Sequence, residues 1–302
     1  MKLGLGTAQF GMDYGVTNRR GQVPREEVRR ILERAVASGV EILDTAAAYG
    51  ESEAILGQAL DSCRVFRIVT KTPPLQAGSI GGQEIGRVVD AFKRSLARLA
   101  AAKVYGLLLH RAADAFVPGG GRLLEALAGL KAQGLVHKVG ASVYSGAEID
   151  RLLVMGGIDL IQLPLSWLDQ RLAMSGHLEK LHAAGVEVHA RSVFLQGILL
   201  AAPETLPEDF APLREHLRAC RARFDNAGLS PVEAALGYPA GRKEVSTVLC
   251  GVSSLAEFED LLAGYPRVTR EFDWLSCSLA DPAWLDPSRW SAVGAAAPRI
   301  VQ

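Results

Sequence analysis

The chain has 302 residues, of which 49% are hydrophobic, and its 33 basic residues balance its 33 acidic residues. This length and apolar content are enough for a large buried core, and a neutral chain lacks the basic excess that a nucleic-acid surface needs. No uncharged apolar run approaches the roughly 18 residues of a membrane span, so we expect no membrane partner.

The four cysteines, Cys63, Cys220, Cys250 and Cys277, are widely spaced, without a CxxC pair or a histidine cluster beside them. This spacing favours reduced thiols and argues against a zinc site. The first residues read directly as a strand, without the apolar leader of a secretory signal. We therefore expect a soluble, cytoplasmic globular protein that holds no metal.

Short apolar runs alternate with helical patterns along the chain. In the first half we expect strands at 3–10, 40–43, 65–70 and 104–109. The helices between them are expected at 25–38, 53–60, 85–101 and 123–132. In the second half we expect strands at 137–142, 160–163, 186–192 and 245–249. Helices are expected there at 146–155, 172–184, 212–227, from 231 onward and at 255–263.

This alternation predicts an α/β protein with a (β/α)8 TIM barrel. A doubly wound sheet is the alternative. It is disfavoured because Gly4-Leu-Gly6 is not followed by the third glycine and the helix of a dinucleotide fingerprint. No linker interrupts the pattern, so we expect one barrel domain over residues 1–302. Residues 267–302, rich in Trp and Pro, are expected as a C-terminal tail over one end of the barrel.

Polar side chains stand at or just after the ends of three consecutive strands: Asp44 and Tyr49, then Lys71, then His110. Taken singly, each has an ordinary explanation as a cap, a packed ring, a solvated cation or a loop histidine. Because the carboxyl ends of the strands in a parallel barrel meet at one mouth, we expect these four side chains to lie together.

These residue types suit the reduction of a carbonyl group. A tyrosine has a pKa near 10, and a nearby ammonium is expected to lower the pKa of Tyr49, while Asp44 fixes Lys71. A histidine such as His110 can hydrogen-bond to a substrate carbonyl. We therefore predict that Tyr49 protonates an oxygen while a hydride reaches the adjoining carbon.

The segment Asp44-Thr-Ala-Ala-Ala-Tyr49-Gly, with Lys71 and Leu108-Leu-His110, resembles the aldo-keto reductase superfamily. Leu3-Gly-Leu-Gly-Thr7 and Gly134-Leu-Val-His-Lys-Val-Gly-Ala-Ser142 are similar to it too, and the likeness covers about residues 1 to 265. The resemblance implies a (β/α)8 barrel that binds NADP or NAD without a Rossmann domain. It also implies Tyr49 as the general acid, Asp44 and Lys71 as its tuning pair, and His110 as the residue that orients the substrate carbonyl.

The resemblance further implies a cofactor site. Ser142 and Gln162 match positions that hold the nicotinamide carboxamide, with Val143 where the family usually has Asn. Arg191 falls where many members place an aromatic residue that stacks on the nicotinamide, and Ser192 follows it. The other implied cofactor-binding residues are Gly6, Thr7, Phe194, Gln196, Gly197, Gly251, Ser253, Ser254 and Glu257.

Two positions bear on the choice between NADPH and NADH. Glu257 stands where NADP-preferring members carry Arg or Gln, and Leu261 stands where an Asn contacts the adenine. A carboxylate repels a 2′-phosphate but accepts a hydrogen bond from a free ribose hydroxyl. We therefore expect a weakened preference for NADPH, unless Arg191, Arg242 or Lys243 compensates.

The expected substrate is a small carbonyl compound, an aldehyde, a ketone or a sugar. Its pocket is expected to be lined by Phe10, Met12, Tyr14, Tyr144 and Trp167. The alternative function is a regulatory barrel that binds the cofactor with negligible turnover. Metal-dependent hydrolysis is remote, since the sequence lacks the His/Asp cluster that such sites need.

Overall fold

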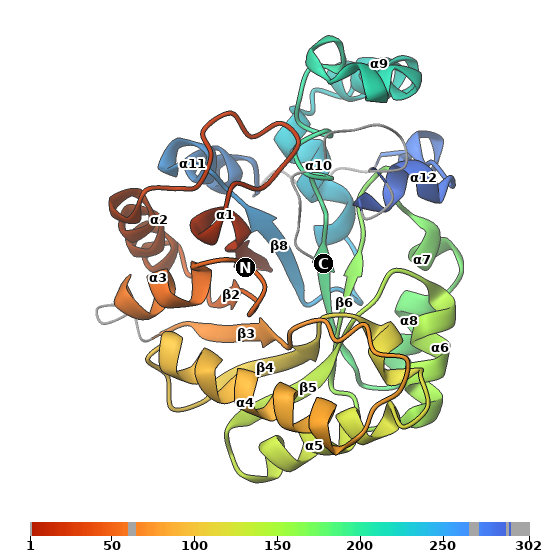
Figure 1. Cartoon of the computed structure of the whole chain (residues 1–302). Coiled ribbons are helices and arrows are strands. Elements are labelled where there is room, and N and C mark those ends of the chain that lie inside the picture. The colour runs from red at the N-terminus through yellow and green to blue at the C-terminus, as the bar shows by residue number, and fades with distance from the viewer. Residues whose placement is uncertain (1, 60–64, 266–271, 288–289, 291–302) are drawn as a thin grey trace.

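Eight parallel strands close into a barrel in sequence order, with β8 paired to β1 (Figure 1). The computed structural model describes residues 2–59, 65–265, 272–287 and 290. The strands are β1 (Leu3–Gly6), β2 (Ile42–Asp44), β3 (Arg67–Lys71), β4 (Val104–Leu109), β5 (Val136–Ser142), β6 (Leu160–Pro164), β7 (Glu187–Arg191) and β8 (Thr247–Gly251). The (β/α)8 barrel expected from the sequence is thus confirmed.

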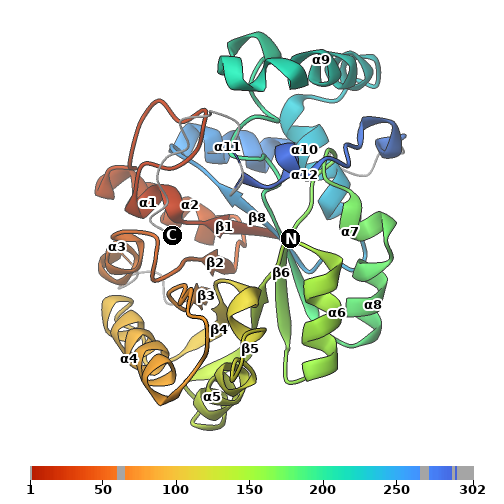
Figure 2. The same cartoon turned by 45° about the vertical axis from the view of Figure 1, so that its right-hand side comes forward.

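Helices surround the strands, as both Figure 1 and Figure 2 show. The helices of this ring are α2 (Arg25–Ala37), α3 (Ser52–Ala59), α4 (Gly82–Arg98), α5 (Gly121–Ala132), α6 (Gly146–Met155), α8 (His177–Ala183), α10 (Pro231–Ala240) and α11 (Leu255–Gly264). Four further helices are α1 (Ala8–Gly11), α7 (Arg171–Met174), α9 (Ala211–Asn226) and α12 (Pro282–Leu285). Among the described residues, no helix is long and apolar enough to cross a membrane.

The alternation of side chains along each strand determines in which layer of the barrel the functional residues lie. Apolar side chains of alternate strand positions form a small separate cluster: Ile42, Val69, Leu108, Leu160 and Leu249. Since side chains two residues apart point the same way, the next inward position on each strand lies one layer nearer the carboxyl end. Those next positions are Asp44, Lys71, His110, Gln162 and Gly251.

The first strand is shorter than expected. The sequence predicts a strand to Phe10, but residues from Ala8 onward form the short helix α1. This helix packs so closely on the turn after β2 that a Cβ at Gly11 would lie 2.0 Å from the carbonyl oxygen of Tyr49. Only glycine allows this approach, so α1 helps to hold the backbone of the turn that carries Tyr49.

The helix expected at 172–184 is also wrong in detail, because it is two helices, α7 and α8. Gly176 interrupts them with a φ of 75°, in the left-handed region that favours glycine. Elsewhere the expected elements are present, with ends displaced by a few residues.

Residues 272–287 lie against the rest of the chain through aromatic packing and hydrogen bonds. The ring of Trp274 is 4.6 Å from that of Phe272 and 6.1 Å from that of Phe224 on α9. The backbone N–H of Leu279 donates to the carbonyl of Leu168 at 2.8 Å. Cys63 and residues 267–271, 288–289 and 291–302 of the expected tail lie outside the described residues.

Candidate active site

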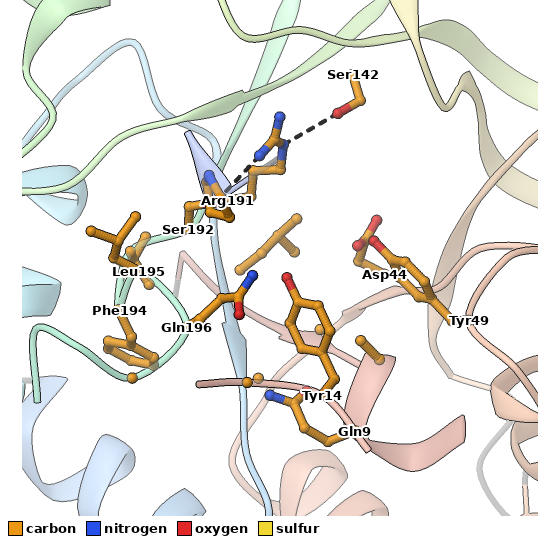
Figure 3. A pocket seen from close by; sticks show the side chains of 18 of the residues that line it. Gln9, Tyr14, Asp44, Tyr49, Ser142, Arg191, Ser192, Phe194, Leu195 and Gln196 are labelled. Carbon is orange, nitrogen blue, oxygen red and sulfur yellow. Dashed lines mark hydrogen bonds between the residues drawn. The ribbon is translucent and has the colours of Figure 1, made fainter. Parts of the chain in front are cut away.

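A cavity of about 1440 Å³ opens at the carboxyl ends of the strands (Figure 3). Its lining includes the last residue of six strands: Gly6, Asp44, Lys71, Ser142, Arg191 and Gly251. Tyr49 and His110, which follow β2 and β4, also line it. The structure therefore brings together Asp44, Tyr49, Lys71 and His110, as their positions in the sequence indicate.

A buried ion pair lies at the base of this cavity. The Lys71 ammonium donates to both carboxylate oxygens of Asp44 at 2.7 Å and to the carbonyl of Thr45 at 3.0 Å. Only 1% of the Lys71 side chain and 8% of the Asp44 side chain are exposed. Gln162 donates from Nε2 to the same carboxylate at 2.5 Å. All three ammonium donors are therefore used, and the pair is fixed in place.

The electrostatics of Tyr49 differ from the expectation. Lys71 Nζ lies 4.9 Å from the centroid of the Tyr49 ring, and its donors point to Asp44 and Thr45. Burial, followed by the charge of Asp44, raises the pKa of Tyr49 above its ordinary value. The expected lowering of this pKa by Lys71 is thus wrong. Tyr49 stays protonated and can donate a hydrogen bond.

His110 is a neutral imidazole at ordinary pH. Burial, then the charges of Lys71, Arg191 and Arg111, lower the pKa of His110 to about 3. Its ring meets that of Tyr49 edge-on, with 5.8 Å between centroids. Its Nδ1 is buried without a hydrogen-bond partner among the described residues. A neutral imidazole beside the Tyr49 ring can share a hydrogen bond with a ligand.

Arg191 occupies the end of β7 as a rigidly held cation. Its guanidinium donates to Ser142 Oγ at 3.2 Å, to Ser192 Oγ at 3.2 Å and to the Val143 carbonyl at 3.0 Å. It also stacks on Tyr144, with 4.1 Å between Cζ and the ring centroid. Figure 3 shows Arg191 and Ser142 on one side of the pocket and Asp44 and Tyr49 on another.

The loop after β7 is strained where it lines the cavity. Ser192, Leu195 and Gln196 have φ values of 58°, 47° and 54°, and Gly197 has 92°. Non-glycine residues in this region cost roughly 1–3 kcal/mol each and gather at functional sites. No periodicity in the sequence indicates this conformation.

Two buried amide oxygens test whether a nicotinamide dinucleotide fits. Gln162 Oε1 and Gln196 Oε1 are both buried and have no hydrogen-bond partner within the described part of the chain. A carboxamide and ribose hydroxyls are hydrogen-bond donors that buried oxygens of this kind need. Gln196 lines the cavity, so it offers such an acceptor to a bound cofactor, and the residues present fit the group there.

Most of the expected cofactor residues line the cavity. These are Gly6, Thr7, Ser142, Arg191, Ser192, Phe194, Gln196, Gly197, Gly251, Ser253 and Glu257. Gln162 and Ser254 lie behind its wall, Gln162 on Asp44 and Ser254 as the N-cap of α11. Arg242 lies under the ring of Tyr238, at 4.6 Å, and neither it nor Lys243 lines the cavity. This position gives no support to their suggested compensation for a carboxylate near a phosphate.

The expected substrate pocket is only partly correct. Tyr14 and Tyr144 line the cavity, whereas Phe10, Met12 and Trp167 do not. Phe10 and Trp167 are 0% exposed and belong to the core, because α1 and the segment after β6 turn these side chains inward. The sequence reading missed Glu148, Arg171 and Asp286, which also line the cavity. They come from helix starts and the C-terminal segment, where no strand pattern marks them.

Two carboxylates occupy the N-terminus of α11, next to Gly251 and Ser253. Glu257 Oε2 accepts from the backbone N–H of Ser253 at 2.6 Å. Glu27 reaches across from α2, and its Oε1 accepts from the N–H of Leu255 at 2.7 Å. Two backbone donors of this helix start, those of Ser253 and Leu255, are thus already paired with carboxylates. No group of acidic, histidine or cysteine residues that could hold a metal occurs among the described residues.

Comparisons with known proteins agree with this architecture. Residues 2–272 match the model of the "Aldo/keto reductase family". An aldo-keto reductase of Mycobacterium sp. (strain KMS) is 31% identical over 195 residues, which cover 60% of this chain and 64% of that protein. The NADH-specific methylglyoxal reductase of Escherichia coli (strain K12) is 27% identical over 229 residues, 70% of this chain and 68% of that protein.

Among solved structures, the holo form of an aldo-keto reductase from Bacillus halodurans superimposes with a TM-score of 0.71 at 21% identity. The superposition covers 99% of this chain and 94% of that one, and it supports the fold alone. The chain spans about 64% of the length of its mycobacterial relative. With a family match over nearly all of its residues, the chain belongs to the aldo/keto reductase family.

Proposed function

We propose that this protein reduces a small aldehyde, ketone or sugar carbonyl with NADH or NADPH, and that Tyr49 is the proton donor. The observation that supports this proposal is the convergence of Asp44, Tyr49, Lys71 and His110 in one cavity. A protonated tyrosine beside a buried ion pair and a neutral histidine suits the protonation of a carbonyl oxygen.

Each of the four side chains has a separate part in the proposed reaction. The Tyr49 hydroxyl donates a hydrogen bond to the carbonyl oxygen and then gives it the proton. The raised pKa keeps Tyr49 protonated until the oxygen becomes an alkoxide, a stronger base than the phenolate. The pair of Lys71 and Asp44 holds one positive charge beside the ring and thereby limits the cost of the phenolate. Neutral His110 orients the carbonyl.

A nicotinamide dinucleotide, when bound, supplies the hydride. Gln196 offers a buried acceptor for its polar groups, and the loop from Ser192 to Gly197, which holds Gln196, lines the same cavity. The alternative is a barrel that binds the cofactor with negligible turnover. It is favoured by one observation: Arg191 already engages Ser142 Oγ, a group expected at the nicotinamide.

The test of the reductase is the loss of nicotinamide absorbance at 340 nm with a panel of small aldehydes that includes methylglyoxal. We expect Tyr49→Phe to lower kcat by about 10²–10⁴-fold, because general acid catalysis is lost, and to leave the Kd of the cofactor nearly unchanged. Tyr105→Phe, a tyrosine bonded to Glu187 away from the cavity, is the matched control and should keep wild-type kcat. Equal rates for Tyr49→Phe and wild type would exclude Tyr49 as the acid.

The neutral state of His110 predicts a pH dependence of stability. Its pKa in the folded chain is about 3, below the value near 6.5 of an unfolded chain. Between these values the unfolded chain binds a proton that the folded chain does not, so stability falls as the pH falls through this window. From pH 8 to pH 5, wild type should lose more free energy of unfolding than His110→Asn, by on the order of 1–2 kcal/mol. Urea unfolding at both pH values measures this, and equal losses would contradict it.

We further propose that the protein prefers NADH. The adenosine end is expected beside Gly251 and Ser253, where Glu257 and Glu27 hold two backbone donors at the start of α11. A 2′-phosphate would meet the Glu257 carboxylate there, whereas a ribose hydroxyl can donate to it. The NADH-specific relative of E. coli is consistent with this preference.

Glu257→Arg tests the preference, because it replaces a repulsive charge with an attractive one. We expect the Kd of NADPH to fall by about tenfold or more, a change of roughly 1.4 kcal/mol, while that of NADH rises or stays constant. Glu259→Arg makes the same change in charge on the same helix outside the cavity, and should leave both constants unaltered. Tighter binding of NADPH than NADH by the wild-type protein would contradict the preference.

A further inference from the structure

Arg191 is a cation in the cavity that forms no ion pair with a carboxylate of the described residues. Two other cations that line the cavity are paired: Lys71 with Asp44 at 2.7 Å, and Arg171 with Asp169 at 2.8 Å. Arg191 donates only to uncharged oxygens, those of two serines and one backbone carbonyl. Within the described ranges no carboxylate oxygen lies within 4 Å of its guanidinium.

The charge of Arg191 reaches the reacting groups. It is one cause of the lowered pKa of Lys71, after burial and against the opposing charge of Asp44. It acts in the same direction on His110, after burial and Lys71. Since the charges of Lys71 and Asp44 offset each other and His110 is neutral, the charge of Arg191 is not offset within this group of four residues. Asp286, on the C-terminal segment, is the carboxylate that attracts Arg191 from farther away.

This charge is fixed in position. Three hydrogen bonds and the stacking on Tyr144 hold the planar guanidinium from several directions. A guanidinium remains protonated at all ordinary pH values. A ligand that enters the cavity therefore meets a guanidinium that keeps both its position and its positive charge.

Resting on the proposed carbonyl reduction, we propose that Arg191 makes the site bind the reduced nicotinamide more tightly than the oxidised one. Hydride transfer requires the two reacting carbons to lie about 3–3.5 Å apart, so the nicotinamide must share the chamber of Tyr49 and Arg191. The reduced ring is neutral and the oxidised ring is a cation. Repulsion between two like charges in one buried chamber predicts a difference in Kd of at least about tenfold.

Charge and electrons balance in this scheme. The reduced cofactor gives a hydride to the carbonyl carbon and becomes a cation, while Tyr49 gives a proton to the carbonyl oxygen and regains one from solvent. The cation then leaves a site that repels it. Each tenfold difference in Kd between the two forms raises the potential of the bound couple by about 30 mV. Arg191 is thus a residue that tunes release of the oxidised cofactor and the balance between reduction and alcohol oxidation.

The experiment measures the Kd of NADH and of NAD⁺ separately, by protein fluorescence and by competition, without any carbonyl substrate. The variants are Arg191→Met, which removes the charge, and Arg191→Lys, which keeps it. Arg171→Met is the matched control, because it removes a cavity arginine whose charge Asp169 neutralises. Thermal unfolding of each variant checks that it folds.

We expect wild type to bind NADH at least about tenfold more tightly than NAD⁺. Arg191→Met should bring the ratio of the two constants near one, mainly by tightening NAD⁺, while Arg191→Lys and Arg171→Met keep the wild-type ratio. A wild-type ratio near one overturns the proposal, even if Arg191→Met does not fold. If Arg191→Met weakens the binding of NADH and of NAD⁺ equally, the proposal is also overturned. Arg191 would then contact a part of the cofactor that the two forms share. If wild type binds neither form, the proposed function fails and this inference fails with it.

Discussion

The ion pair between Lys71 and Asp44 is the interaction on which the rest of the site depends. Burying two charges costs several kcal/mol per ion unless the geometry is close and the remaining donors are satisfied. Here both conditions hold, since the ammonium has three acceptors and the carboxylate has a further donor in Gln162. The pair fixes the distance between β2 and β3 at their carboxyl ends, and with it the place of the Tyr49 ring over Lys71.

The two ends of the cavity differ in the sign of the charged side chains that a ligand would meet. Around Tyr49, Lys71 is paired with Asp44 and His110 is neutral, so the charge of Arg191 acts on anything bound there. At the start of α11 two backbone donors are held by Glu257 and Glu27. On the two proposals, Arg191 disfavours a positive nicotinamide at the first end, and Glu257 disfavours a 2′-phosphate at the second.

The barrel and the central residues could be predicted from the sequence because they follow a period of two. Ile42 and Asp44, Val69 and Lys71, and Leu108 and His110 are pairs in which a core residue precedes a polar residue on the same face of a strand. That local pattern is enough to place the polar residues at one mouth.

The features that could not be predicted from the sequence depend on contacts between distant segments. Phe10 and Trp167 were expected in the pocket, but the path of the chain after β1 and β6 buries them. The pKa of Tyr49 was expected to fall, but the donors of Lys71 turn toward Asp44. Glu27 and Leu255 are far apart in the chain, and nothing near either residue shows that one caps the helix of the other. The positive φ values between Ser192 and Gly197 likewise have no local signal.

The most direct test of the central claim follows the hydride itself. The protein is incubated with a small aldehyde and reduced cofactor that carries deuterium at the transferable position of the nicotinamide, and the alcohol is analysed by mass spectrometry and NMR. The account predicts one deuterium on the carbinol carbon. Alcohol without deuterium on that carbon, or no alcohol from any aldehyde or ketone despite bound cofactor, would contradict it.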